Sequence, residues 1–178
     1  MSDGRESKHF SPTPRSMAYP DFVEKFGGVY EHFPGIAERA FGDGLTLATD
    51  TPEGLAAAMA DVAASLDKPA KLLLISNHPD LAGRAAIARE LTQSSKSEQA
   101  GAGLDRCTPE EYRRFQELND AYKAKFGFPF VLAVGDKTRR EILAAFESRL
   151  RNDRDREFET ALAEIDKIAR LRLHALAV

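Results

Sequence analysis

A histidine–proline pair, His78–Pro79, ends an apolar run in the stretch LLISNHPDLAG. Proline disfavours helical backbone in the residue before it and has no N–H to donate, so we expect His78 where a regular element ends. An imidazole with a pKa of about 6.5 gains or loses a proton near neutral pH, which suits acid–base catalysis in a cleft. The alternative is a structural histidine that caps the last carbonyls of a helix. The nearby Asp80 would either orient the ring or cap the next helix.

A carboxylate and a carboxamide stand side by side in the stretch TQSSKSEQAGAG, at Glu98 and Gln99. If a helix starts at Ser97, both side chains lie in its first turn, and the small residues that follow allow close approach to a neighbouring segment. Together they offer acceptors and donors to a ring that carries adjacent N–H and C=O groups. The alternative is a solvated helix start, where the helix dipole favours a glutamate.

An arginine lies on the apolar face predicted for the last helix. Arg172 continues this face at helical spacing, whereas Arg170 points to the surface. A buried guanidinium needs an anionic partner or a route to water, so Arg172 is a candidate ligand for an anionic group. The alternative is a side chain that extends to solvent from a fraying helix end. The apolar members of this face are Phe158, Leu162, Ile165 and Ile168.

Helical periodicity dominates the rest of the chain, so helices must position these residues. Thr51 predicts the start of one helix, and Thr108 with Glu111 predicts a capping box for another, which Gly127 would end. Two runs, KLLLIS and FPFVLAV, have the composition of short buried strands, so an α/β fold stays an alternative. We predict an all-α fold, a single-domain helical bundle with a buried extended segment near residues 128–134.

Composition and charge exclude several classes of protein. The 178 residues carry a net charge of −3, which gives no reason to expect binding to nucleic acid or to an anionic membrane. The single cysteine, Cys107, excludes an internal disulfide, and no cysteine–histidine cluster has metal-site spacing, so we predict no metal. No apolar stretch is long enough to span a membrane. We predict a flexible tail over residues 1–17, one domain over residues 18–178 and a cytoplasmic location.

Six blocks occur in an order that resembles the OHCU decarboxylase family, where OHCU is 2-oxo-4-hydroxy-4-carboxy-5-ureidoimidazoline. The blocks are FGGVYEHFPGIAERAF, NHPDLAG, SSKSEQAGAGL, FQELNDAYKAKFGFPFVLAV, ILAAFESRLRN and EIDKIARLRL. The resemblance covers roughly residues 20 to 176. The chain departs from the family pattern in HFPG, where Gly35 stands in place of a tryptophan that relatives often carry.

The resemblance implies an all-helical fold of the OHCU decarboxylase type, which works without a cofactor and commonly forms homodimers. The implied activity is the last step in the conversion of urate to allantoin, in which OHCU is decarboxylated to (S)-allantoin and CO2. Loss of CO2 leaves an electron pair on carbon, and the substrate ring has its own C=N bond to accept it, so no borrowed electron sink is needed.

The resemblance also implies which residues form the site. The histidine of the His-Pro block matches His78, which would be catalytic together with Glu98. The segment after Gly-Phe-Pro would form a backbone wall against the substrate ring, and the closing arginine matches Arg172 better than Arg170. The implied substrate-binding residues are Pro79, Ser95, Lys96, Ser97, Glu98, Gln99, Phe130, Val131, Leu132, Ala133, Val134 and Arg172.

Two alternatives to this activity stay open. One is a non-catalytic helical binding module, in which His78, Glu98 and Arg172 form a structural polar cluster. The other is a decarboxylase that acts on a related ureido or imidazoline compound, with the Gly35 turn as the place to look for altered substrate shape.

Overall fold

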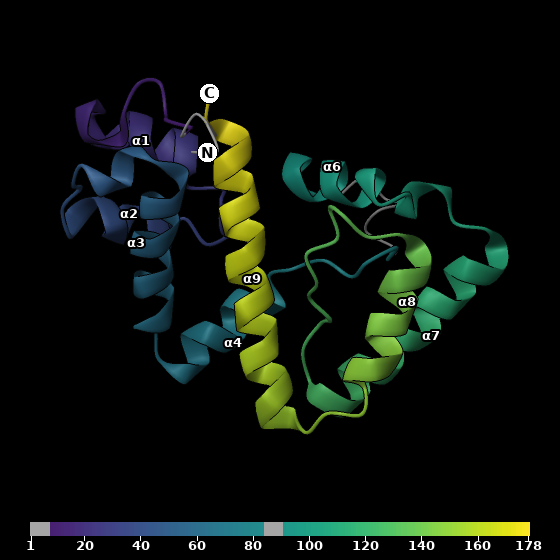
Figure 1. Ribbon diagram of the computed structural model, residues 1–178. Coiled ribbons are helices and arrows are strands. Elements are labelled where there is room, and N and C mark those ends of the chain that lie inside the picture. The colour runs from purple at the N-terminus through teal and green to yellow at the C-terminus, as the bar shows by residue number, and fades with distance from the viewer. Residues whose placement is uncertain (1–7, 84–90) are drawn as a thin grey trace, which may run out of the picture. The chain divides into compact units, whose positions relative to one another are not determined.

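Helices make up every regular element in the part of the chain that the computed structural model describes, residues 8–83 and 91–178 (Figure 1). The predicted all-α class is therefore confirmed. The α-helices are α1 Tyr19–Phe26, α2 Gly35–Gly42, α3 Pro52–Ala64, α4 Lys68–Ser76, α6 Gln93–Gly101, α7 Pro109–Phe126, α8 Arg139–Arg149 and α9 Arg154–Leu176. Short 3₁₀ helices are η1 Pro14–Ser16, η2 Ala48–Asp50 and η3 Leu104–Arg106.

Side-chain caps set helix boundaries where the sequence predicted them. The Thr51 hydroxyl accepts the Gly54 N–H at 3.2 Å at the start of α3. Thr108 and Glu111 exchange hydrogen bonds as a capping box at the start of α7. Helix α7 ends at Gly127, whose φ of +79° lies in the left-handed region that favours glycine. These boundaries follow from local chemistry alone.

The two ambiguous apolar runs adopt different structures. The run KLLLIS lies within α4, so the strand alternative is wrong there. The run FPFVLAV contains neither helix nor strand and is buried throughout, which confirms the buried segment predicted near residues 128–134. Gly127 and Pro129 prevent α7 from continuing, and burial of the apolar side chains then holds the segment in place.

The described residues divide into two compact units. Unit 1 holds the N-terminal helices as far as Lys68 together with Asp166–Val178, and unit 2 holds Pro69–Ile165. Helix α9 contributes to both units, because the division falls within it. One domain over residues 18–178, which the chain length favours, stays a prediction.

Unit 1 includes residues that the sequence assigned to a flexible tail. Phe10 is 2% exposed, and its ring contacts that of Phe26. His9 exchanges two backbone hydrogen bonds with Val178. The tail prediction is therefore wrong from residue 8 onward, because one buried ring anchors a stretch whose polar composition suggested disorder. Residues 1–7 lie outside the described part of the chain.

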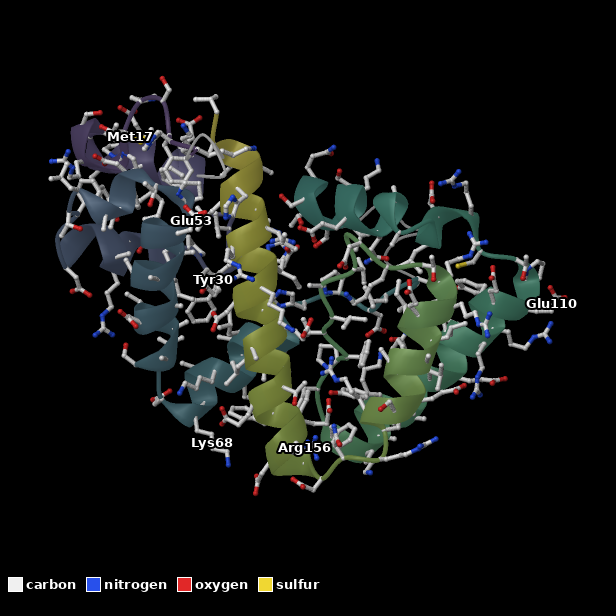
Figure 2. All side chains as sticks on the ribbon, in the orientation of Figure 1. Met17, Tyr30, Glu53, Lys68, Glu110 and Arg156 are labelled. Carbon is white, nitrogen blue, oxygen red and sulfur yellow. The ribbon has the colours of Figure 1, made fainter. Side chains whose placement is uncertain are left out.

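A buried tyrosine links the two parts of the chain that make up unit 1. Tyr30, labelled in Figure 2, donates from its hydroxyl to Asp166 of α9 at 2.8 Å. Burial is the main cause that raises the pKa of Tyr30, and the charge of Asp166 adds to it, so the phenol stays protonated. Burial also raises the pKa of Asp166, against the hydrogen bond from Tyr30, which lowers it.

Unit 2 is built on an aromatic core. Helix α7 buries one apolar face against this core. Tyr112, at the start of that face, is only half-buried. Phe130 of the irregular segment stacks on Phe146 of α8, with ring centroids 3.7 Å apart. This stacking ties the segment to α8. The buried members of the α7 face are Phe115, Leu118, Tyr122 and Phe126.

Candidate active site

His78 lies just after the end of α4, where the following proline was expected to end a regular element. It is 7% exposed, and its backbone N–H donates to the Ile75 carbonyl at 3.1 Å. Ring atom Nδ1 lies 3.1 Å from the carbonyl oxygen of Leu74, one helical turn back. The side chain therefore caps a helix carbonyl, and that contact holds the imidazole at a fixed angle.

The contact with Leu74 decides which ring nitrogen carries the proton. A carbonyl oxygen only accepts hydrogen bonds, so Nδ1 of His78 must be the donor. In the neutral ring Nε2 is then the unprotonated nitrogen. The structural and acid–base interpretations of His78 are thus compatible, because they use different nitrogens.

Asp80 does not orient the imidazole. Its Oδ2 accepts a hydrogen bond from Lys123 Nζ at 2.6 Å, while the Leu74 carbonyl holds the ring of His78. The other expectation, that Asp80 caps a following helix, concerns residues 84–90, which lie outside the described part of the chain.

Helix α6 begins at Gln93, earlier than the predicted start at Ser97. Thr92 causes this start, because its hydroxyl accepts the backbone N–H of Ser95 at 3.2 Å. Glu98 therefore lies beyond the first turn, where the helix dipole has little effect on a carboxylate. The account of Glu98 as a dipole-favoured residue at a helix start is wrong.

The predicted residues of α6 separate into buried and exposed members. Ser95 and Gln99 are buried, and Glu98 is half-buried. Lys96 and Ser97 are exposed. Residues four apart share one face of a helix, so Ser95 and Gln99 point inward together while Lys96 and Ser97 point away from that face.

Gln99 connects the α6 block to the histidine block. Its Oε1 accepts the backbone N–H of Ala82 at 3.1 Å, and its Nε2 donates to the carbonyl of Asp80 at 3.4 Å. Asp80 and Ala82 belong to the loop that follows His78. The two predicted blocks therefore meet within unit 2, and the contact between them is a carboxamide bound to loop backbone.

Helix α7 supplies further side chains to the same loop. Gln116 Nε2 donates to the carbonyl of Ala82 at 2.7 Å, and Asn119 Nδ2 donates to the carbonyl of Leu81 at 2.9 Å. The sequence predicted the boundaries of α7 but not this polar face. The signal that could have revealed it is two carboxamides three residues apart, beside the aromatic face.

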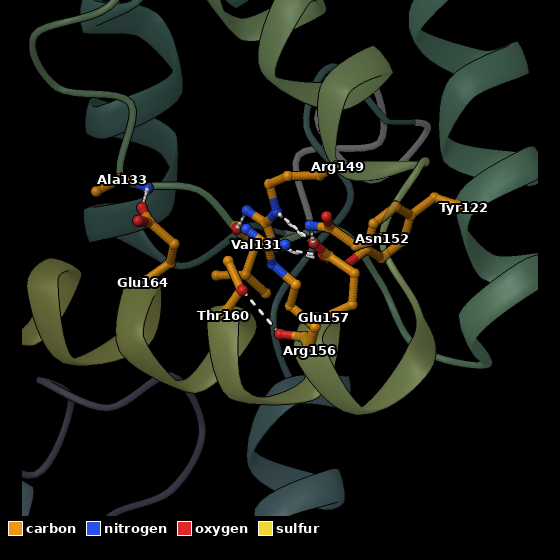
Figure 3. Close-up of polar contacts among 9 residues, drawn as sticks. All are labelled: Tyr122, Val131, Ala133, Arg149, Asn152, Arg156, Glu157, Thr160 and Glu164. Atoms are coloured by element: carbon orange, nitrogen blue, oxygen red, sulfur yellow. Dashed lines mark hydrogen bonds and ion pairs between the residues drawn. The ribbon is translucent and has the colours of Figure 1, made fainter.

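The predicted wall, residues 130–134, is buried and anchored at two of its peptide groups (Figure 3). Arg149 Nη1 donates to the carbonyl of Val131 at 2.6 Å. The backbone N–H of Ala133 donates to Glu164 Oε2 at 2.9 Å. These contacts fix the orientation of peptide groups in a segment that has no regular hydrogen-bond pattern of its own.

A buried ion pair holds Arg149 in turn. Its Nη2 lies 2.9 Å from Glu157 Oε2, and Tyr122 and Asn152 also donate to that carboxylate (Figure 3). Burial by itself would raise the pKa of Glu157, but hydrogen bonds from Arg149, Tyr122 and Asn152 together lower it, so the carboxylate is ionised at neutral pH. Burial and the bond to Glu157 raise the pKa of Tyr122, which keeps the phenol a donor.

The apolar spacing in ILAAFESRL predicts Leu143 and Leu150 on the inner face of α8, and that prediction is wrong. Leu143 is half-buried and Leu150 is the residue that ends the helix, whereas Arg149 is buried. Arg149 follows Ile142 by two helical turns, so it lies on the apolar face. An arginine at that spacing was the available signal, of the same kind that pointed to Arg172.

Arg172 is buried in unit 1 and Arg170 is exposed, as the helical face predicted. Nη1 of Arg172 lies 2.8 Å from Glu31 Oε2 and 3.3 Å from the carbonyl of Val29. Glu31 is itself buried, and it is the anionic partner that a buried guanidinium requires. The approach of Arg172 to His78 stays a prediction.

Gly35 begins α2 and is exposed. A Cβ atom added to Gly35 would meet nothing within 4 Å, and its backbone needs no glycine. Local packing therefore does not explain the departure from the family pattern at this position.

Two kinds of site are not found in the described residues, 8–83 and 91–178. No group of three or more histidine, cysteine, aspartate or glutamate side chains there could hold a metal ion. None of the helices described combines the length and the apolar character needed to cross a bilayer.

Comparison of the sequence and the structure with known proteins identifies the family of this chain. The family model described as OHCU decarboxylase matches residues 15–174, a range that contains every site residue above. The chain belongs to the OHCU decarboxylase family. A family member from Halalkalicoccus jeotgali, named 2-oxo-4-hydroxy-4-carboxy-5-ureidoimidazoline decarboxylase, is 43% identical over 157 residues, which cover 88% of this chain and 85% of that protein. The Xenopus laevis protein of the same name is 36% identical, and the match covers 90% of this chain and 90% of that protein.

Two crystal structures share the fold of this OHCU decarboxylase family member. An (S)-allantoin synthase superposes with a TM-score of 0.72 at 31% identity, covering 92% of this chain. The present chain spans about half, 52%, of that longer protein. An OHCU decarboxylase crystallised in the presence of (S)-allantoin gives a TM-score of 0.65 at 25% identity, covering 80% of this chain and 89% of that one.

Proposed function

We propose that this member of the OHCU decarboxylase family converts OHCU to (S)-allantoin and CO2 without a cofactor. One observation carries the proposal: the imidazole of His78 is fixed through Nδ1, and the loop after it is bound by Gln99 of the carboxylate–carboxamide pair. These contacts support a site in unit 2 where an imidazole would exchange protons and the carboxylate–carboxamide pair would bind a ureido ring.

The reaction breaks the bond between a ring carbon and its carboxylate. The electron pair of that bond stays on the substrate and moves toward the adjacent C=N bond, so that a C=C bond forms and the nitrogen gains a proton. The hydroxyl group then loses a proton to become a carbonyl, and the neighbouring carbon gains one to form the C–H bond of allantoin. Each of these steps after CO2 loss is a proton transfer, which an oriented imidazole accelerates.

We assign the proton exchange to Nε2 of His78, beside the hydroxyl group of the substrate. Glu98 and Gln99 would bind the ureido and ring N–H and C=O groups, with Pro79 and Ser95 bordering them. Each polar atom of the Gln99 amide makes one hydrogen bond to the loop and can make a second one to the substrate. The peptide groups of residues 130–134 would hold the ring flat, and Arg172 would supply positive charge to an anionic oxygen. A proton delivered to one face of the ring gives one enantiomer of allantoin.

Homodimer formation and a cytoplasmic location belong to the same proposal. Both are supported by the family resemblance, and the location also by the composition of the chain. Cofactor independence is supported by the chemistry of the substrate, whose own C=N bond accepts the electron pair.

The test is a coupled conversion of urate. Purified urate oxidase and hydroxyisourate hydrolase generate OHCU in place, and circular dichroism follows the formation of optically active allantoin. We expect this protein to give rapid formation of the S enantiomer. Slow racemic allantoin, as in the reaction without added protein, would contradict the proposal.

The same experiment separates the two alternatives. A binding module would leave the rate unchanged while retaining ligand-induced stabilisation by allantoin, which thermal unfolding detects. A decarboxylase of a related compound would leave OHCU untouched and release CO2 from another ureido-substituted imidazoline.

A further inference from the structure

Three carboxamides from two helices bind the short loop that follows His78–Pro79. We call Gln99, Gln116 and Asn119 the loop clamp. Their contacts with the loop are hydrogen bonds to peptide groups of Asp80, Leu81 and Ala82, at 2.7 to 3.4 Å. Every carbonyl of this three-residue loop accepts a hydrogen bond from one of the three amide groups.

The backbone of this loop includes an unfavourable conformation that needs support from neighbouring groups. Ala82 has a φ of +49°, in the left-handed region that a residue with a Cβ atom seldom adopts. Such a conformation persists only when its surroundings determine it. The clamp binds both backbone polar groups of Ala82, since its N–H donates to Gln99 and its carbonyl accepts from Gln116.

Asn119 is the member of the loop clamp that is buried with one polar atom unsatisfied. It is 2% exposed, and its Oδ1 is a buried oxygen with no hydrogen-bond partner in the described part of the chain. A buried amide that leaves one polar atom unsatisfied is unfavourable compared with an apolar residue of the same size. Among the described residues, the contact that favours an asparagine here is the hydrogen bond from its Nδ2 to the carbonyl of Leu81.

We infer that Asn119 is a positioning residue for His78, and this inference rests on the proposed decarboxylase function. By binding the Leu81 carbonyl, Asn119 sets the path of the loop and so the exit of the chain at Pro79. The carbonyl of Leu74 fixes His78 from the helix side, and the clamp fixes it from the loop side. Asn119 itself does not touch the substrate; it keeps Nε2 within reach of the hydroxyl group.

The first test is Asn119→Leu, which keeps the size of the side chain and removes the donor. We expect kcat for OHCU to fall about 10- to 100-fold, because small displacements of a catalytic group are costly, while KM changes less than about twofold. The matched control is Leu118→Val, which perturbs the core side of the same helical turn. We expect it to lower the thermal midpoint at least as much and to leave kcat within about twofold of the wild type.

The second variant, Asn119→Asp, tests the inference through the pH dependence of kcat, which a purely structural role of Asn119 would not change. When ionised, the introduced carboxylate would place an acceptor against the Leu81 carbonyl, and only its protonated form can donate. The ratio of the kcat of this variant to that of the wild type should therefore rise as the pH is lowered, whereas the ratio for Asn119→Leu should stay constant.

Two results would overturn the inference. One is a kcat for Asn119→Leu that equals the wild-type value at a temperature where both are folded. The other is a loss of kcat in both Asn119→Leu and Leu118→Val that simply follows their thermal midpoints. A wild-type protein without activity would instead contradict the proposed function. The imidazole resonances of His78, one of four histidines, would then still report whether Asn119→Leu displaces the ring.

Discussion

The two nitrogens of the His78 imidazole have different roles in the proposed reaction. Nδ1 donates to the carbonyl of Leu74, and we assign the proton exchange to Nε2. The sequence located this residue because proline follows it, but sequence alone could not choose a tautomer. That choice depends on which backbone carbonyl lies beside the ring, and helix α4 places Leu74 there.

The division of roles predicts different outcomes for two substitutions of His78. In His78→Asn the side-chain amide can still donate to the Leu74 carbonyl, but it cannot titrate. We expect this variant to lose decarboxylation while its free energy of unfolding stays near the wild-type value. His78→Ala should lose activity and also about 1–3 kcal/mol of stability, because a buried carbonyl is left unpaired.

Urea unfolding and the coupled urate assay measure both quantities for each variant. Full activity in His78→Asn would show that Nε2 is not the acid–base atom. Equal stability of His78→Asn and His78→Ala would show that the contact with Leu74 contributes little.

Other single residues show what a sequence pattern can and cannot supply. Arg172 was found because a charge on an apolar face is conspicuous at helical spacing. Its partner Glu31 was not found, because it lies in a turn with no periodicity, and the pairing joins residues 141 positions apart. Long-range partners of this kind depend on packing that the local sequence does not encode.

At the scale of elements, three helix boundaries were predictable from a residue that caps or ends the helix. Thr51, Thr108 and Gly127 each act through hydrogen bonds or backbone conformation within a few residues. The start of α6 was misplaced because Thr92, the actual cap, precedes a weakly apolar stretch. The polar face of α7 was missed since its partners are loop carbonyls, which every residue type possesses.

A buried guanidinium holds one of the two anchored peptide groups in the irregular segment of unit 2. Arg149→Met removes the donor to Val131 and leaves Glu157 buried without its cation. We expect a loss of about 3–5 kcal/mol in the free energy of unfolding, and a higher KM for OHCU because the wall peptides are no longer held.

The double variant Arg149→Met/Glu157→Leu provides the control for this prediction. Removing both charges should restore most of the stability but not the KM, since the carbonyl of Val131 remains without its donor. Urea unfolding and steady-state kinetics of the single and double variants give the comparison. A double variant as unstable as Arg149→Met would show that charge burial is not the cause.

At the scale of the whole molecule, each unit contains a carboxylate with a shifted pKa, and the two shifts have opposite directions. Glu157 is buried and Asp166 is half-buried. The pKa of Glu157 in unit 2 is lowered, so its contribution to stability is present above the unfolded-state pKa and is lost as the pH falls through the folded-state value. The pKa of Asp166 in unit 1 is raised by burial, so its contribution is present at low pH and is lost as the pH rises.

We therefore expect Asp166→Asn to raise the thermal midpoint at neutral pH and to have little effect below about pH 4, where the carboxyl of the unfolded chain is also protonated. The hydroxyl of Tyr30 can still donate to the amide oxygen of the variant. Glu157→Gln should lower the midpoint at neutral pH and flatten its acid dependence. Thermal unfolding between about pH 3 and 8 tests both variants, and parallel pH profiles for the two would contradict the assignment.

The hydrogen bonds between His9 and Val178 have a practical consequence for engineering. The backbone groups of His9 and Val178 already touch, so a linker of a few residues that joins Val178 to His9 would close residues 9–178 into a ring. New ends could then be opened at the exposed turn around Asp43 and Gly44. A circular permutant of this design should keep its activity, whereas a bulky fusion attached directly at Val178 would compete with the pairing of these two residues.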